Sequence, residues 1–288
     1  PISELGRHTE PMPTIETAGL TDTGRVRETN EDSFIVATLQ RSLLVHDTSP
    51  GARGWFAGDG AGTMLVVADG MGGQGGGDVA SQTAVRAVVN HLLNCIPWTG
   101  CEEAPPSSPA HSASLPGVRD GLSTALEVGD STVRTAGENS GTPRMGTTLT
   151  LALIMWPALY VAHVGDTRCY LYRGGKLTRL TTDHTLAQQL AQVSAKPVDP
   201  SSHLNHVLWN SLGASQNAPQ PEIRRVGLER GDLILLCSDG LTKHVGDERI
   251  AQFLGTRGPP RERCAMLIAE ANAQGGTDNI TAVIAELG

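Results

Sequence analysis

Five acidic residues stand where predicted strands begin or end, a placement that could assemble a metal site. Asp69 and Asp239 each close an apolar run and precede a glycine, whereas Glu31, Asp32 and Asp278 each stand just before an apolar run. In an antiparallel sheet the end of one strand lies beside the start of its neighbour, so these carboxylates could gather at one edge. Crowded carboxylates repel one another unless cations lie among them. Because neither cysteine nor histidine recurs with them, the pattern predicts Mg²⁺ or Mn²⁺.

Each of these residues also has a simpler interpretation when it is taken alone. A single Asp-Gly pair is usually a turn. Glu31 and Asp32 could be a solvated strand start, Arg27 a surface cation and Asp166 a turn residue. Only the order in which all of them occur along the chain favours a site.

The glycine-rich stretch after Asp69 allows a second interpretation. Gly70, Gly72 and Gly75 spell G-x-G-x-x-G between an apolar strand and a helix that begins near Asp78, as in dinucleotide-binding folds. That pattern expects a second strand after the helix, with an acidic residue about 20 positions on. Here a Pro- and Ser-rich stretch, residues 94–116, follows instead. A dinucleotide-dependent oxidoreductase is therefore disfavoured, and NAD binding without a metal requirement would restore it.

The strands that must position these residues are short, closely spaced and separated by tight turns, which is typical of antiparallel sheets. Apolar patterns predict strands at residues 17–20, 33–39, 64–68, 149–155, 159–164, 169–172, 177–180, 223–226, 232–237 and 280–286. Helical periodicity predicts helices at residues 78–88, 118–136, 183–193, 248–254 and 261–274. Residues 40–63 carry turn signals and are expected to form a hairpin arm. We expect residues 1–14 to be a flexible lead-in and residues 15–288 to form one domain.

Composition narrows the possible partners. The chain of 288 residues has 22 Lys and Arg against 30 Asp and Glu, a net charge of −8, and aromatic residues make up 3%. The net charge disfavours binding to nucleic acid and to anionic membranes, and the scarcity of aromatic residues disfavours a stacking surface for nucleic acid. No apolar stretch approaches the length of a membrane span. Its five cysteines lack zinc-site spacing, and Cys169 and Cys237 fall in apolar runs. We expect buried thiols and a cytoplasmic location.

Seven motifs follow one another in a familiar order: RETNED, VVADGMGG, GTT, HVGDTR, DHT, CSDG and GGTDN. This series resembles the type 2C metal-dependent protein serine/threonine phosphatases, and the resemblance runs from about Thr17 to Leu287. Met71 in the DGMGG motif is similar to bacterial members of the family. The resemblance implies an α+β fold: a central sandwich of two antiparallel β-sheets flanked by helices, in four layers α-β-β-α, with a two-metal site at one end.

The resemblance also assigns a role to each acidic residue. Asp69 would bridge two Mn²⁺ or Mg²⁺ ions, and the Gly70 carbonyl would bind one of them. Asp239 and Asp278 would bind the other ion. Glu31 would hold a metal-bound water, with Asp32 behind the metal ligands.

Five further residues receive supporting roles from the same resemblance. Arg27 would bind the substrate phosphate through its fork of N–H donors. Asp166 and Asn279 would orient their neighbours through hydrogen bonds, and the Asp183–His184 pair would be structural. The implied reaction is hydrolysis of phosphoserine or phosphothreonine in proteins by a water activated between two divalent ions. None of the five cysteines begins a C-x₅-R loop, which disfavours a cysteine-dependent phosphatase.

The chain departs from the family pattern at several positions. Arg144 stands where bacterial members often carry an aspartate that helps to bind a third metal, and its charge disfavours a third ion. Met71 replaces a histidine of eukaryotic members that is a candidate general acid, so metal-bound water or another group would protonate the leaving group. Residues 189–206 correspond to the mobile flap of the family but differ from it in sequence. Residues 94–116 resemble an insertion.

The expected partner is a phosphoprotein, with a Ser/Thr kinase and the targets of that kinase as candidates, and we expect a monomer. A different class of function stays open, because this fold can serve as a catalytically silent regulatory binding module after its metal ligands are lost. Against that alternative, every core ligand position is filled in this chain.

Overall fold

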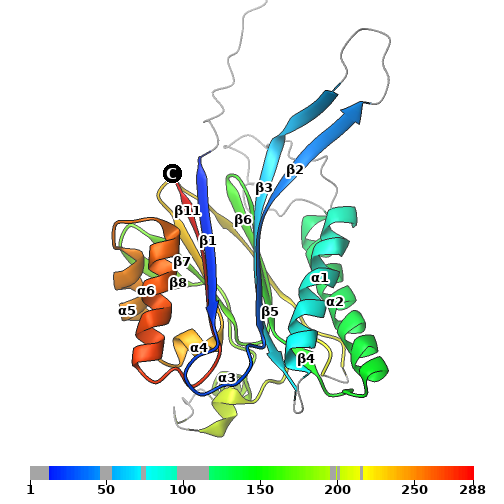
Figure 1. Cartoon of the computed structure of the whole chain (residues 1–288), viewed down its shortest axis with the longest axis vertical. Coiled ribbons are helices and arrows are strands. Elements are labelled where there is room, and N and C mark those ends of the chain that lie inside the picture. The colour runs from blue at the N-terminus through cyan, green and yellow to red at the C-terminus, as the bar shows by residue number, and fades with distance from the viewer. Residues whose placement is uncertain are drawn as a thin grey trace, which may run out of the picture.

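Two antiparallel sheets lie face to face in the computed structural model, and helices cover both outer faces (Figure 1). The structure describes residues 13–45, 54–72, 76–95, 117–194, 199, 202–214 and 217–288. This arrangement confirms the predicted α+β sandwich with four layers, α-β-β-α.

The first sheet has the order β1-β11-β10-β7-β8. Its strands are β1 (Ile15–Asp22), β7 (Arg168–Arg173), β8 (Lys176–Arg179), β10 (Leu233–Cys237) and β11 (Ile280–Leu287). The second sheet has the order β2-β3-β5-β6-β9, and β4 pairs with the end of β3. Its strands are β2 (Asp32–Val45), β3 (Gly54–Met71), β4 (Gly146–Thr147), β5 (Leu149–Met155), β6 (Ala158–Val164) and β9 (Glu222–Gly227).

Helices α1 (Gly77–Cys95) and α2 (Val118–Ser140) cover the second sheet. Helices α4 (Asp239–Thr242), α5 (Asp247–Leu254) and α6 (Pro260–Ala273) cover the first sheet. The described residues also include helix α3 (Leu186–Ser194) and the 3-10 helix η2 (His203–His206). In Figure 1, α3 and α4 lie at one end of the sandwich, away from the end at which β2 and β3 project.

Strand β3 shows why apolar runs form the centre of the sandwich. Leu65 and Val67 pack between the two sheets, while Met64, Val66 and Ala68 pack beneath α1 and α2. Because successive side chains of a strand point to opposite faces, a strand that is buried on both faces must be apolar at every position. The same alternation in β10 places Leu236 between the sheets and Leu235 against the helices of the other outer layer.

The predicted elements agree with the structure except at their ends. The hairpin arm is confirmed, but β2 extends to Val45 and β3 begins at Gly54, so the paired strands are longer than expected. Strand β3 was expected to end at Asp69 and continues to Met71, because Gly70 and Met71 pair with β4. Helix α4 was not predicted, and α3 begins at Leu186 rather than at residue 183.

Several expectations lie outside the described residues. They concern the lead-in up to residue 12, most of the stretch 94–116, residues 73–75 of the glycine-rich motif, and residues 195–198 and 200–201 of the segment compared with a flap. In the part of the chain that the structure describes, no helix has the length and apolar character needed to cross a bilayer.

The topology also decides against a dinucleotide-binding unit. After β3 and α1 the next element in the described chain is helix α2 rather than a strand. The strand pairs of both described sheets are antiparallel. A dinucleotide fold needs parallel strands joined through a helix, so the G-x-G-x-x-G spacing here belongs to another kind of turn.

Candidate active site

The centre of the site lies where β2 begins and β3 approaches its end. Asp32 and Asp69 are register partners across these two strands. The backbone N–H of Asp69 donates to Thr148 Oγ1 at 3.0 Å, and its carbonyl accepts from the Thr148 N–H and the Thr147 hydroxyl, both at 2.9 Å. The GTT motif therefore fixes the backbone that carries Asp69.

Two glycines allow the chain to close tightly around Glu31. Gly70 donates its N–H to the Glu31 carbonyl at 3.2 Å, and a Cβ at Gly70 would overlap the backbone oxygens of Gly77 and Glu31. A Cβ at Gly77 would meet the Glu31 carboxylate itself. Burial raises the pKa of Glu31, although a hydrogen bond to the Gly77 backbone opposes that rise. The glycine-rich motif thus brings bare backbone against Glu31 at the start of α1.

The other sheet supplies Asp239 and Asp278. Asp239 follows β10 in the first turn of α4, and Asp278 precedes β11. Because β10 and β11 are antiparallel neighbours, these two aspartates lie at the same end of the sheet. The geometry agrees with the prediction that strand ends and starts would meet at one edge.

Asn279 ties the loop before β2 to this end of the first sheet. Its Oδ1 accepts the Glu31 N–H at 2.8 Å, and its Nδ2 donates to the carbonyls of Thr23 and Thr29 at 3.0 and 2.9 Å. The predicted orienting role of Asn279 therefore corresponds to three hydrogen bonds that hold the segment from Thr23 to Glu31.

Asp32 is held from the opposite sheet. Its Oδ2 accepts hydrogen bonds from the hydroxyls of Ser238 and Thr281 at 2.7 and 2.6 Å. Burial raises the pKa of Asp32 to about 7, although both hydroxyls oppose the rise. Sequence reasoning missed Ser238 and Thr281. The only signals were the place of Ser238 beside Asp239 in the CSDG motif and the place of Thr281 two residues after the GGTDN motif.

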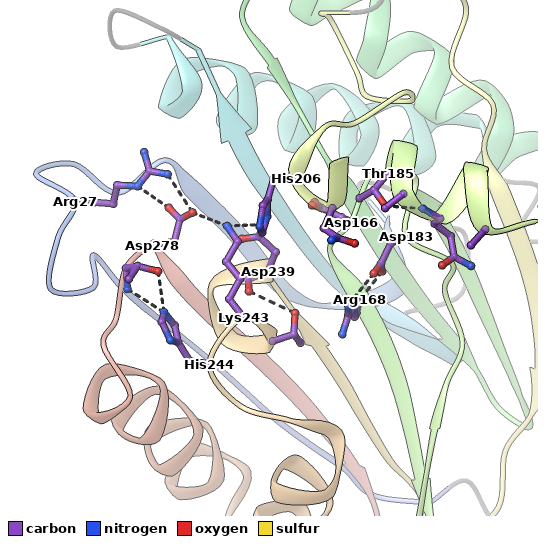
Figure 2. Close-up of a pocket in the computed structure, with 16 residues that line it drawn as sticks. Arg27, Asp166, Arg168, Asp183, Thr185, His206, Asp239, Lys243, His244 and Asp278 are labelled. Carbon is purple, nitrogen blue, oxygen red and sulfur yellow. Dashed lines mark hydrogen bonds and ion pairs between the residues drawn. The ribbon is translucent and has the colours of Figure 1, made fainter. Parts of the chain in front are cut away.

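Lys243 lies between Asp239 and Asp278 (Figure 2). Its Nζ is 2.7 Å from Asp239 Oδ2 and 2.8 Å from Asp278 Oδ2. Arg27 reaches Asp278 from the other side, with Nε 2.8 Å from Oδ1 and Nη2 3.1 Å from Oδ2. Lys243 was not among the predicted site residues. Its signal in the sequence is its position four residues after Asp239, one helical turn away.

The aspartates of the site differ in their pKa shifts: the pKa values of Asp69 and Asp166 are raised, and that of Asp278 is lowered. Burial raises the pKa of Asp69 well above its ordinary value, and the charges of Asp32 and Asp239 raise it further. Burial also raises the pKa of Asp166 well above its ordinary value, and the charge of Asp239 adds to this rise. Burial also favours the neutral form of Asp278, but Lys243 and Arg27 outweigh it and hold the pKa of Asp278 below its ordinary value.

An open cleft exposes these groups. One part, of about 1020 Å³, extends toward α3 and is lined by Arg168, His206 and His244 among others. A second part, of about 740 Å³, extends over Asp69 and Gly70. Both parts are lined by the same six residues: Arg27, Asp166, His206, Asp239, Lys243 and Asp278. The described part of the cleft therefore combines an acidic floor with cationic side chains.

Asp166 faces this cleft (Figure 2), but its predicted hydrogen-bonding role has no counterpart. No hydrogen bond of its carboxylate to another described residue is present. Both oxygens of the neighbouring Asp183 accept hydrogen bonds from Arg168, at 3.0 and 2.7 Å, which agrees with a structural role for Asp183. His184 links the HVGD loop to the segment after η2, because its backbone bonds to Gly165 and Trp209.

Two buried carboxylate oxygens have no hydrogen-bond partner in the described structure, namely Asp32 Oδ1 and Asp239 Oδ1. A buried acceptor without a donor is costly, and both of these oxygens belong to the acidic cluster. These two oxygens are the buried acceptors of the cluster that have no hydrogen-bond donor in the described structure.

A second group of possible metal ligands consists of His163, His184 and Glu222, whose ligand atoms lie within 4.8 Å of one another. His163 is bonded through Nδ1 to the Thr150 hydroxyl at 2.8 Å and through Nε2 to the Thr182 carbonyl at 3.0 Å. Burial lowers the pKa of His163 to about 4, and the charge of His184 adds to this. Burial keeps His163 neutral, and its two hydrogen bonds explain its position as a structural residue.

The structure thus brings nine predicted residues to one end of the sandwich: Arg27, Glu31, Asp32, Asp69, Gly70, Asp166, Asp239, Asp278 and Asn279. Arg144, by contrast, is exposed and does not line the cleft. Cys169, Cys237 and Cys264 are free and buried, which confirms the expectation for the first two.

Known proteins are similar to this chain in both sequence and fold. The protein phosphatase 2C family model matches residues 51–266. Protein phosphatase PhpP of Streptococcus pneumoniae is 30% identical over 276 residues, which cover 95% of this chain and 98% of that protein. The serine/threonine phosphatase of S. agalactiae matches with a TM-score of 0.75 and 25% identity, over 96% of this chain and 100% of the other. The catalytic domain of the phosphatase PstP, solved with two manganese ions, matches with a TM-score of 0.69 and 30% identity, over 95% of this chain and 98% of the other.

Proposed function

The chain belongs to the protein phosphatase 2C family of serine/threonine phosphatases, and we propose that its acidic cluster holds two Mn²⁺ or Mg²⁺ ions for this reaction. Asp69 would be shared by both ions, with the Gly70 carbonyl on one side and Asp239 and Asp278 on the other. Glu31 would orient a water of the metal shell.

The observation that carries this proposal is the pair of buried oxygens without donors, Asp32 Oδ1 and Asp239 Oδ1. They lie in a cluster where burial and mutual repulsion raise the pKa of Asp69 and Asp166. Divalent cations would neutralise this repulsion, and an all-oxygen donor set suits Mg²⁺ or Mn²⁺. The donor set therefore fits the group.

The spacing of the acidic residues is consistent with ions that keep part of their water shell. Among the described residues, only His163, His184 and Glu222 bring three ligand atoms within 4.8 Å of one another, so the aspartates are more widely spread. Mg²⁺ usually retains several waters and binds few carboxylates directly. Asp32 and Glu31 would then act through water rather than by direct ligation.

When bound, two divalent ions would supply a water of lowered pKa as nucleophile and would offset the charge of the phosphoryl group. Arg27 would orient the phosphate, since its side chain is half exposed and lines both parts of the cleft. Its guanidinium binds Asp278 through Nε and Nη2, which leaves Nη1 directed elsewhere. We expect Arg27→Lys to raise KM for a phosphopeptide more than it lowers kcat, because an ammonium lacks the planar fork of donors.

The substrate in this proposal is a phosphoserine or phosphothreonine of another protein, with a Ser/Thr kinase and its targets as candidate partners. The open cleft beside α3 leaves room for the polypeptide around the phosphorylated residue. We further infer a cytoplasmic monomer, and the three free, buried cysteines among the described residues support a reducing compartment.

The experiment is hydrolysis of a phosphothreonine peptide by purified protein with Mn²⁺, with Mg²⁺ and with EDTA. Asp239→Asn is the test variant, and Asp120→Asn, at an exposed helical position, is its matched control. Metal-dependent release of phosphate that only Asp239→Asn abolishes supports the proposal. Folded protein that releases no phosphate with either metal would refute it and favour a silent phosphatase-like binding module.

A further inference from the structure

Lys243 is a cation that the fold itself places among the proposed metal ligands. Its backbone N–H bonds to the Asp239 carbonyl at 2.8 Å at the end of α4, so one helical turn separates the two residues. The ammonium bridges Asp239 and Asp278, at 2.7 and 2.8 Å. Figure 2 shows Lys243 between these two aspartates.

The surroundings keep this ammonium charged. Burial favours the neutral amine, but the charges of and hydrogen bonds to Asp239 and Asp278 outweigh burial and raise the pKa of Lys243 above its ordinary value. The side chain is only about a quarter exposed, with 26% of its surface accessible. Solvent therefore screens these ion pairs less than it would screen pairs on an open surface.

The bridge has a consequence for the second metal ion. Asp239 and Asp278 are the two carboxylates that the proposed centre assigns to that ion, and each already gives Oδ2 to Lys243. An ammonium and a divalent cation at the same pair of carboxylates repel each other strongly at this range. While it stays in this bridge, the Lys243 ammonium therefore opposes coordination of the second ion.

We propose that Lys243 is an internal competitor of the second divalent ion, and that it sets the metal concentration at which the enzyme becomes fully loaded. This inference rests on the proposed two-metal centre. The first ion, assigned to Asp69 and Gly70, lies on the other side of the cluster and is affected less. Lys243 lines both parts of the open cleft, and this space gives the displaced side chain room to move.

The test is calorimetric titration of metal-stripped protein with Mn²⁺. It compares wild type, Lys243→Met, Lys243→Arg and the exposed control Lys176→Met. We expect the second binding step to tighten at least about tenfold in Lys243→Met, while the first step changes less. Lys243→Arg and Lys176→Met should resemble wild type, because the first keeps the charge and the second is remote from the site.

Thermal unfolding gives a second readout that does not depend on activity. Without Mn²⁺, Lys243→Met should melt below wild type, because Asp239 and Asp278 lose the cation between them. With saturating Mn²⁺ this difference should close, because the tighter second binding step in Lys243→Met offsets the ion pairs that the variant lacks.

The outcomes separate this inference from the proposed function. A second Mn²⁺ step of equal or lower affinity in Lys243→Met would overturn the role of Lys243 and leave the two-metal centre intact. A wild-type protein that binds no Mn²⁺ would overturn both proposals.

Discussion

Asp32 and Asp69 face each other in register across β2 and β3, with Asp32 buried and Asp69 partly buried at the wall of the cleft. Asp32 is held by hydroxyls of the opposite sheet, and Asp69 is held through its backbone by the GTT motif. Their positions are therefore set by the sandwich and not by a flexible loop. Two carboxylates fixed in this way repel each other and destabilise the metal-free fold. A cation bound between them would relieve this repulsion.

Asp32→Asn tests this balance between stability and metal affinity. The Asn carbonyl oxygen can accept from Ser238 and Thr281, while one buried charge disappears. The folded-state pKa of Asp32 is about 7 against an ordinary value of 3.8, so ionisation of Asp32 destabilises the metal-free fold increasingly between those pH values. We expect Asn to stabilise metal-free protein by ~2 kcal/mol above pH 7 and to weaken Mn²⁺ binding about tenfold.

Urea unfolding at pH 4 and pH 8, together with a Mn²⁺ titration, would measure both effects. The stability gain should vanish at pH 4, where the carboxyl is largely protonated in the folded state. An Asn variant that is no more stable than wild type at pH 8, or that binds Mn²⁺ equally well, would contradict the account.

Gly70→Ala is expected to disrupt the site through the backbone. The added Cβ would overlap the backbone oxygens of Gly77 and Glu31, and backbone atoms cannot rotate away. We expect a loss of about 3 kcal/mol of stability and of most activity. Gly227→Ala is the matched control, because its Cβ would meet nothing within 4 Å, and a change within about 0.5 kcal/mol is expected. Equal stability of the two variants by urea unfolding would refute this packing argument.

Asn279→Asp keeps the shape of the side chain and removes its donors. The carbonyls of Thr23 and Thr29 would then face a carboxylate oxygen in place of an N–H group. We expect a loss of about 2–4 kcal/mol in stability and of about 10–100-fold in kcat/KM, because the loop that carries Arg27 and Glu31 loosens. Asn94→Asp, at an exposed helical position, is the control. Wild-type kinetics in Asn279→Asp would contradict the orienting role.

We expect the folded protein to lose stability in acid because His163 is buried in its neutral form. Burial, followed by the charge of His184, lowers its folded-state pKa to about 4 from an ordinary 6.5. The unfolded chain therefore takes up this proton first, so the contribution of neutral His163 is complete above pH 6.5 and is lost as the pH falls toward 4. The loss is roughly 3 kcal/mol.

The measurement is the difference in unfolding free energy between wild type and His163→Gln across this pH range. The difference should shrink toward pH 4, because the variant lacks the titrating group. His203→Gln, at an exposed histidine, controls for the loss of an imidazole. Parallel curves for wild type and His163→Gln would show that His163 is not held neutral.

The residues that could be predicted from sequence are those whose signal is local. Asp69 and Asp239 end runs that are apolar at every position, because both faces of β3 and β10 are buried. The strands of the hairpin arm were underestimated because glycines dilute the strand pattern between Gly54 and Gly62. Pairing with β2, rather than propensity, extends β3.

The missed residues depend on contacts between segments that are distant in sequence. The hydroxyls of Ser238 and Thr281 meet Asp32 only because the two sheets bring β2 and β11 together. Lys243 stands one turn from Asp239, which the sequence indicates, but its second partner, Asp278, lies on another strand connection. Neither the contact of these hydroxyls with Asp32 nor the contact of Lys243 with Asp278 has a period or a motif that a single sequence could reveal.

Anomalous diffraction from a crystal grown with Mn²⁺ would show whether the acidic cluster holds the two proposed divalent cations. We expect two anomalous peaks at the end of the sandwich, one beside Asp69 and the Gly70 carbonyl and one beside Asp239 and Asp278, with Lys243 moved away from both aspartates. Peaks only at His163, His184 and Glu222, or no peaks with the bridge of Lys243 intact, would contradict this expectation.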